Sequence, residues 1–161
     1  MPPYIFREHI ISSDLKAIEE IIRSSGFFSA QEIEIACELA QDRLDQGEQS
    51  SYQFLFLEDQ GKVVGYTCYG LIPATAGSYD LYWIAVAQHM RGRGLGKILM
   101  QKTEERIMEQ GGRAVYVETS SRAQYIPTQR FYEQCNYAPE ATLNDFYAIG
   151  DSKIIYSKIL K

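Results

Sequence analysis

One stretch of the chain limits the possible folds more than any other. Residues 82–86 are a run of apolar, aromatic and β-branched side chains, which predicts a buried strand from about residue 79 to residue 86. The segment Arg91–Lys97 then reads RGRGLGK, and helix-forming residues continue to about Gln110. A strand that leads through glycines into a helix is suited to bind phosphate, because the first helical turn offers free N–H groups and a partial positive charge. Glycines let an anion approach the backbone and basic side chains add charge, so the stretch predicts a pyrophosphate ligand.

The spacing of the glycines separates three kinds of phosphate-binding loop. A P-loop needs Ser or Thr directly after its Gly-Lys pair, but Gly96-Lys97 is followed by Ile98. A dinucleotide fingerprint needs G-x-G-x-x-G, whereas positions 92–96 read G-x-G-x-G. The pattern that remains is Arg91-x-x-Gly94-x-Gly96, which resembles the coenzyme A pyrophosphate loop of the GNAT superfamily of acyl-CoA-dependent N-acyltransferases. On this stretch alone, a glycine-rich turn with solvated basic side chains stays open as the alternative.

A second motif strengthens the resemblance. Residues 129–137 read QRFYEQCNY, a predicted helix that is similar to the second GNAT signature and follows the loop in the expected order. The resemblance is clear from Asp80 to Tyr137 and weaker over the flanking hairpins, and the first fifty residues match only in the order of elements. Three positions depart from the family. Tyr125 stands where many members have Asn, and Thr128 stands where a small residue is usual. Asn136 replaces a Gly, although Asn tolerates a left-handed backbone.

The resemblance implies a fold. It is of the α/β (α+β) class, with a mixed, twisted sheet of six to seven strands and helices on both faces, as in GNAT-like acyl-CoA N-acyltransferases. The strands that hold Val86 and Glu118 are implied to splay apart and admit the pantetheine arm of the coenzyme. At 161 residues, the chain is expected to form a single N-acetyltransferase domain over residues 1–161.

Local patterns predict the individual elements. Asp14 is expected to cap a first helix that ends near Arg23, and Ser29–Glu32 form a capping box for a second helix that ends at Gly47. The unit from residue 79 to residue 119 predicts two parallel strands joined by a helix. A further helix is expected from Pro127 to about Cys135. The other strands are expected at 4–7, 52–57, 63–69, 114–119, 146–149 and 153–156.

The resemblance also implies catalytic roles. Transfer of an acetyl group to an amine requires a carbonyl that is polarised, an acid for the departing thiolate and a route for the proton of the amine. The N–H group of Val86 is implied to polarise the carbonyl, and Tyr132 matches the acid of the family. Asp80 aligns with the base of the histone-acetylating branch, and Glu118 or a chain of water molecules are the alternatives.

The remaining site residues are candidates for binding. For the acceptor pocket, the expected residues are Phe27, Phe28, Tyr82 and Glu118, with Tyr147 as a further aromatic candidate. Acetyl-CoA is the expected co-substrate, with no metal. The expected contacts to the coenzyme are Ile84, Ala85, Val86, Arg91, Gly92, Arg93, Gly94, Leu95, Gly96 and Lys97.

Composition narrows the class of partner. The net charge of −5 argues against nucleic acid, and no apolar run is long enough to span a membrane. Cys37, Cys68 and Cys135 have no metal-ligand spacing and indicate a reducing compartment, so a cytoplasmic location is expected. Between Asp14 and Glu48, nine acids and three bases give a local charge of −6, which favours a cationic acceptor unless these helix faces are simply solvated.

These observations predict an N-acetyltransferase that moves an acetyl group from acetyl-CoA to a primary amine within a ternary complex. The acceptor could be a small amine, an amino acid or peptide, an aminoglycoside or a protein lysine. The contrasting prediction is a non-catalytic acyl-CoA-binding sensor or structural module. The oligomeric state is left open between monomer and homodimer.

Overall fold

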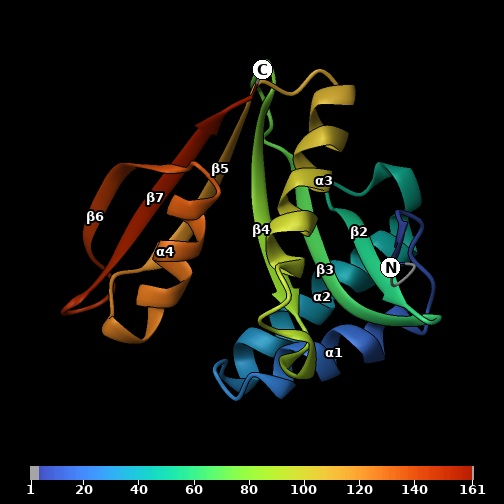
Figure 1. Cartoon of the computed structure of the whole chain (residues 1–161). Coiled ribbons are helices and arrows are strands. Elements are labelled where there is room, and N and C mark those ends of the chain that lie inside the picture. The colour runs from blue at the N-terminus through green and yellow to red at the C-terminus, as the bar shows by residue number, and fades with distance from the viewer. Residues whose placement is uncertain (1–3, 161) are drawn as a thin grey trace. The chain divides into compact units, whose positions relative to one another are not determined.

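The computed structural model describes residues 4–160, and over this range seven strands form one mixed sheet in the order β1-β2-β3-β4-β5-β7-β6 (Figure 1). The predicted sheet of six to seven strands is therefore confirmed. The strands are β1 (Tyr4–Arg7), β2 (Gln53–Asp59), β3 (Lys62–Leu71), β4 (Ser78–Val86), β5 (Ala114–Ser120), β6 (Ala138–Ala148) and β7 (Asp151–Ile159). The helices are α1 (Asp14–Ser24), α2 (Ala30–Gln46), α3 (Leu95–Glu109) and α4 (Ile126–Gln134).

The chain divides into two compact units, each built from two separate segments. The first unit comprises Met1–Gly70 and Trp83–Thr103, and the second comprises Leu71–Tyr82 and Glu104–Lys161. The boundaries pass through β4 and α3, so that each of these elements contributes to both units. The expectation of one domain over the whole chain stays a prediction, and the units are described one at a time.

In the first unit, helices cover both faces of the strands. One face of the β2–β3 hairpin carries large apolar side chains, which pack against α1 and α2 in a shared core that includes Ile18, Ile22, Ile33, Ala36, Phe54, Phe56, Tyr66 and Cys68. Residues 65 and 67 of β3 point to the other face, because side chains alternate along a strand. There the hydroxyl oxygens of Thr67 and Thr103 lie 2.7 Å apart, which joins β3 to α3.

Local signals explain how the second helix begins and ends. The side chain of Ser29 accepts a hydrogen bond from the N–H of Glu32, and the carboxylate of Glu32 accepts one from the N–H of Ser29, as the capping box predicts. Gly47 closes the helix at a φ of 59°. The predicted apolar stripe is also present, because Ile33, Ala36 and Ala40 are buried.

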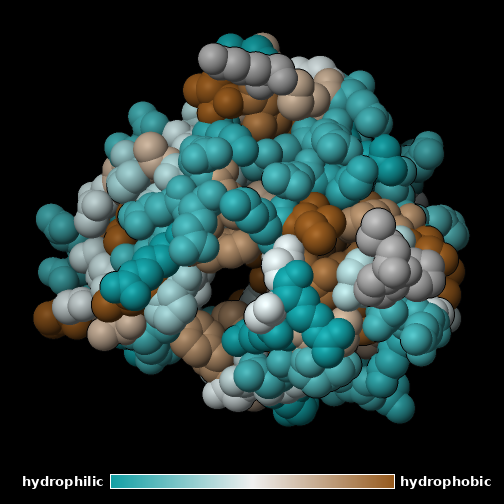
Figure 2. Space-filling view, viewed as in Figure 1, coloured by the Kyte–Doolittle hydropathy of each residue, from teal (hydrophilic) through white to brown (hydrophobic). Residues whose placement is uncertain are grey.

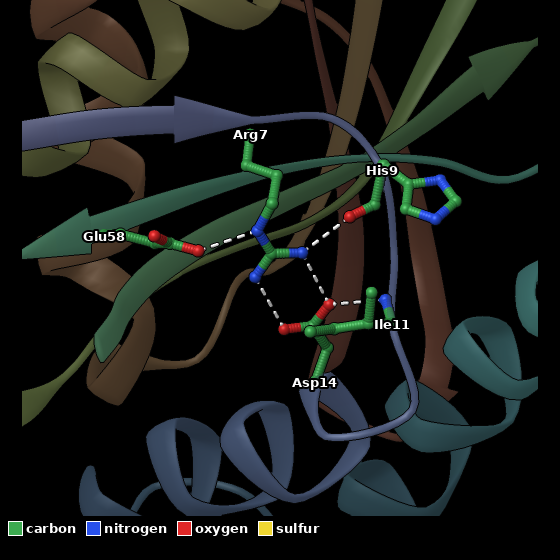
Figure 3. Close-up of polar contacts among 5 residues, drawn as sticks. All are labelled: Arg7, His9, Ile11, Asp14 and Glu58. Carbon is green, nitrogen blue, oxygen red and sulfur yellow. Dashed lines mark hydrogen bonds and ion pairs between the residues drawn. The ribbon is translucent and has the colours of Figure 1, made fainter. Parts of the chain in front are cut away.

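The prediction that Asp14 caps the first helix was wrong. Asp14 is the first residue of α1, and the residue at the cap position, Ser13, makes no capping hydrogen bond with its side chain. The carboxylate of Asp14 instead accepts a hydrogen bond from the N–H of Ile11 and two from the guanidinium of Arg7, at 2.9 Å each (Figure 3). The Nε of Arg7 also donates to Glu58 at 2.7 Å, so one arginine connects β1, β2 and α1.

In the second unit, the predicted parallel pairing of β4 and β5 is confirmed, with Ser78–Asp80 opposite Ala114–Tyr116. Strand β5 pairs with β7 in antiparallel register, and β7 pairs in the same way with β6, which places β7 between them (orange and red in Figure 1). Helix α4 covers one face, where the ring of Tyr132 lies 5.8 Å from that of Tyr156.

Two boundaries in the second unit differ from the predictions. Strand β6 begins at Ala138, well before the predicted start at Phe146, and every residue of it is exposed. Its exposure explains the difference, because an edge strand of this kind has no alternating apolar pattern. Helix α4 begins at Ile126, one residue before the predicted Pro127, and Asn136 closes it with a φ of 70°, as expected.

Candidate active site

The predicted phosphate-binding loop has the backbone geometry that such a site requires. A short turn over Gln88–Met90 follows β4, and α3 begins at Leu95. The carbonyl oxygen of Gly94, directly before the helix, accepts a hydrogen bond from the N–H of Ile98 at 3.2 Å. Gly92 and Gly94 adopt φ values of 80° and 75°, which favour glycine. A Cβ atom at either position would meet no protein atom within 4 Å, so the space beside the backbone is open to a ligand.

Buried side chains at both ends hold this loop in place. Met90 and Leu95 are buried, whereas Arg91, Arg93 and Lys97 are exposed and can move toward an anion. The first turn of α3 presents N–H groups that have no acceptor one turn earlier in the helix, and the helix dipole adds partial positive charge there. Together these groups can hold a pyrophosphate.

The end of β4 beside this loop lies close to β3 because of a glycine that the sequence analysis did not single out. A Cβ atom on Gly65 would lie 2.9 Å from Cδ1 of Leu99 and 3.1 Å from the carbonyl oxygen of Ala85. Gly65 therefore allows both α3 and residues 84–86 to approach β3 closely. Its position within a predicted strand was the available signal, since glycine there often marks a close approach of the backbone.

The candidate carboxylates lie on one face of the sheet of the second unit. Asp80 is opposite Tyr116 in the register, Glu118 follows Tyr116 by two residues, and Ser120 is opposite Lys153. Since side chains alternate along each strand, Asp80, Glu118 and Lys153 share a face. The Nζ atom of Lys153 lies 2.7 Å from Oε1 of Glu118, an ion pair that sequence patterns did not reveal because the partners come from different strands.

Asp80 occupies a setting that makes its carboxyl group easier to protonate. Burial is the main cause that raises the pKa of Asp80, and the negative charge of Glu118 raises it further. The positive charge of Lys153 acts in the opposite direction and lowers the pKa. A raised pKa is what a carboxylate needs to act as a base toward a weakly acidic proton.

Tyr132 lies on the opposite face of this sheet, within a cluster of aromatic side chains. Tyr156, whose ring is 5.8 Å from that of Tyr132, is opposite Val117 in the register and so points away from Glu118. The ring of Tyr137 lies 6.2 Å from Tyr132 on the same side. Tyr132 is 7% exposed, and burial raises its pKa above the ordinary value, so the phenol keeps its proton.

The aromatic acceptor candidates divide between the units. Phe27 and Phe28 belong to the first unit, where their rings meet edge to face with centroids 5.1 Å apart. Phe28 also contacts Trp83 at 5.1 Å, which ties the segment between α1 and α2 to β4. Tyr82 belongs to the second unit and is exposed, as is Tyr147. Within residues 4–160 the structure brings no three metal-ligating side chains together.

Comparisons with known proteins agree with this architecture. The sequence profile described as the acetyltransferase (GNAT) family matches residues 15–137. A crystal structure described as an acetyltransferase of the GNAT family from Desulfovibrio desulfuricans is 40% identical, with a TM-score of 0.95, and the match covers 97% of this chain and 98% of that chain. A search of curated proteins returns no match.

More distant structures share the fold. The ribosomal-protein-S18-alanine N-acetyltransferase from Escherichia coli is 18% identical, with a TM-score of 0.73 and coverage of 98% of this chain and 94% of that chain. An aminoglycoside 6'-N-acetyltransferase complexed with coenzyme A is 16% identical, with a TM-score of 0.75 and coverage of 96% of each chain. The profile match and the relative at 40% identity show that this chain is an acyltransferase that belongs to the acetyltransferase (GNAT) family.

Proposed function

We propose that the protein transfers an acetyl group from acetyl-CoA to a primary amine by direct attack in a ternary complex. The observation that carries this proposal is the glycine loop Arg91–Lys97, whose backbone leaves open space beside Gly92 and Gly94 at the start of α3. The amine adds to the carbonyl carbon of the thioester, and the tetrahedral intermediate that forms then expels the thiolate. The amine must lose a proton and the sulfur must gain one, and Asp80 and Tyr132 are proposed for these two roles.

The loop Arg91–Lys97 is proposed to hold the pyrophosphate of acetyl-CoA. Its support is the open space beside Gly92 and Gly94 and the exposed basic side chains around them. Ile84, Ala85 and Val86 would lie along the pantetheine arm, and the N–H of Val86 would donate to the carbonyl oxygen of the thioester. Such a backbone donor favours the negative charge that develops on this oxygen in the transition state.

Proton transfer then uses the two side chains in turn. Asp80 accepts a proton from the amine as the nitrogen attacks the carbonyl carbon. The C–S bond breaks as the tetrahedral intermediate collapses, and the phenol of Tyr132 donates its proton to the sulfur. The products are the acetylated amine and coenzyme A, and bulk water returns the proton from Asp80 to Tyr132.

The structure favours Asp80 over Glu118 as the base. Glu118 is committed to an ion pair with Lys153, whose Nζ atom lies 2.7 Å from its Oε1 atom. Within residues 4–160, Asp80 forms no ion pair of this kind, and burial raises its pKa. Glu118 is therefore proposed to contact the acceptor without removing its proton.

A cationic acceptor is the proposed class of substrate. The support is the acidic surface of the first unit, where α1 and α2 border a cleft of about 370 Å³ lined by Leu15, Lys16, Glu19, Glu34, Cys37, Glu38 and Gln41. Negative charge of this kind raises the local concentration of cations. Phe27, Phe28 and Tyr82 are proposed to contact the apolar part of the acceptor.

The test is a panel of amines assayed for release of coenzyme A thiol. The panel would contain monoamines, diamines, amino acids, aminoglycosides and lysine peptides, with acetyl-CoA as the donor. The proposal expects acetylation of at least one amine, detected by mass spectrometry, at a rate well above acetyl-CoA hydrolysis. Tight binding of the coenzyme with no acetylated product across the panel would favour a sensor instead.

A further inference from the structure

Lys153 occupies an unusual position for a lysine on a strand near the edge of a sheet. Its side chain is only 14% exposed, and its Nζ atom lies 2.7 Å from Oε1 of Glu118. The same atom lies 3.8 Å from the centre of the Phe146 ring and 6.0 Å from that of Tyr147. An ion pair and an aromatic ring together fix the position of this cation.

The environment of Lys153 connects it to the proposed base. Lys153 on β7 and Glu118 on β5 share a face with Asp80 on β4, and they are the charged groups that act on the carboxyl group of Asp80. Without Lys153, the neighbouring carboxylates of Asp80 and Glu118 would lose the cation that lies beside Glu118. Like charges so placed favour protonation of one of them.

We propose that Lys153 is a positioning residue that sets the protonation of this site: it holds Glu118 as an ion pair and keeps Asp80 ionised and available as the base. This inference rests on the proposed role of Asp80. Lys153 itself transfers no proton and contacts neither substrate. The rings of Phe146 and Tyr147 restrict its position, which keeps its charge beside Glu118.

Two charge-removing variants test the proposal because they act in opposite directions. Lys153→Met removes the cation and leaves Glu118 uncompensated, so Asp80 should release its proton at a higher pH. Glu118→Gln removes the anion and frees Lys153, so Asp80 should release its proton at a lower pH. Lys153→Arg keeps the charge and should resemble the wild type. Lys62→Met, at the exposed β2–β3 turn, is the matched control for loss of a lysine.

The first readout does not depend on activity. Carbon-13 labelling of aspartate carboxyl groups allows Asp80 to be titrated by NMR, and the resonance is assigned by its loss in Asp80→Asn. The proposal expects a higher midpoint in Lys153→Met, a lower midpoint in Glu118→Gln, and no change in the two controls. Equal midpoints in all variants, or shifts of the same sign in the two charge-removing variants, would overturn it.

The second readout is the pH profile of kcat/KM with the best amine of the panel. Lys153→Met should lose roughly three- to tenfold on the acid side of the profile and less than about twofold at its upper end, as expected when the pKa of a base rises by up to one unit. If Asp80→Asn keeps full activity, Asp80 is not the base. The NMR titration still decides whether Lys153 shifts the midpoint of Asp80. If Lys153→Met does not fold, Glu118→Gln and Lys153→Gln provide the same comparison.

Discussion

At the scale of single residues, Gly94 is the most direct test of the coenzyme site. Gly94→Val would place a branched side chain in the open space beside the backbone, and we expect affinity for coenzyme A to fall at least about tenfold. Isothermal titration calorimetry measures this change. Gly61→Val is the matched control, because Gly61 has a similar φ of 79° in a hairpin turn outside the loop. Equal affinities for the two variants would exclude the loop as the site.

Tyr132 is the test of acid catalysis. Tyr132→Phe keeps the ring that packs against Tyr156 but removes the proton, so kcat should fall by roughly 10²- to 10⁴-fold while coenzyme affinity changes little. Tyr156→Phe removes a hydroxyl from the same aromatic cluster and should leave kcat within about twofold of the wild type. Pre-steady-state measurements isolate the chemical step. An unchanged rate for that step would assign Tyr132 to packing alone.

Asp80 should reduce stability as well as serve catalysis. Its pKa in the folded chain is raised, chiefly by burial, so the ionised form that predominates at neutral pH costs stability and the protonated form does not. Asp80→Asn should therefore raise the free energy of unfolding at pH 7, and the gain should disappear as the pH falls through the pKa of Asp80. Urea unfolding at several pH values measures this. A gain that persists in acid would show that burial of the charge is not its cause.

At the scale of elements, Arg7 is the connection that holds the first strand and helix to the hairpin (Figure 3). Arg7→Met would leave Asp14, whose side chain is 2% exposed, without its cation, and we expect a loss of about 3 kcal/mol or more in the free energy of unfolding. Lys16→Met removes an exposed helical ion pair and should cost less than about 0.5 kcal/mol. Similar losses for both variants in urea unfolding would contradict this account.

Elements with local signals were predictable from the sequence. The capping box at Ser29 and Glu32 and the glycines of the phosphate loop require particular residue types at fixed spacing, whatever the rest of the chain does. The left-handed backbone at Asn136 is a third example. The family resemblance supplied the number of strands and the order of the two motifs.

Features that depend on distant partners were not predictable in this way. Asp14 looks like a helix cap in sequence, but its partner is Arg7 on another element. The ion pair of Lys153 with Glu118 depends on the register of β7 against β5, which no local pattern specifies. The part of β6 before Phe146 was not predicted, because the strand starts beside Pro139 and is exposed throughout.

At the scale of the whole molecule, charge should decide how acceptors approach. Hydrophilic residues cover most of the face in Figure 2, with hydrophobic patches between them, and the net charge is −5. The segment from Asp14 to Glu48 has a local charge of −6, and Arg7 forms an ion pair with its Asp14. When Arg7 is counted with this segment, its local charge is −5. Within residues 4–160, no helix combines the length and hydrophobicity needed to cross a bilayer.

An acceptor with a second positive charge should therefore have a higher kcat/KM than a neutral-bodied amine of equal size. The advantage should shrink as ionic strength rises from low to physiological values, because salt screens the field between separated charges. Steady-state kinetics with matched pairs of amines at two salt concentrations measure the effect. A preference for anionic or purely apolar amines that does not depend on salt would show that the acidic helices take no part in selection.

The division of the chain into two interleaved units has a consequence for biosynthesis. Neither unit is a continuous segment, since the first needs Trp83–Thr103 in addition to its earlier part and the second needs Leu71–Tyr82 in addition to its later part. During translation, α1, α2 and the β2–β3 hairpin emerge early but lack the residues of α3 that cover their other face. The first unit can close once Thr103 has emerged, whereas the strand that carries Lys153 emerges later. In a nascent chain, the phosphate-binding loop should therefore fold before Lys153 and Glu118 can pair beside Asp80.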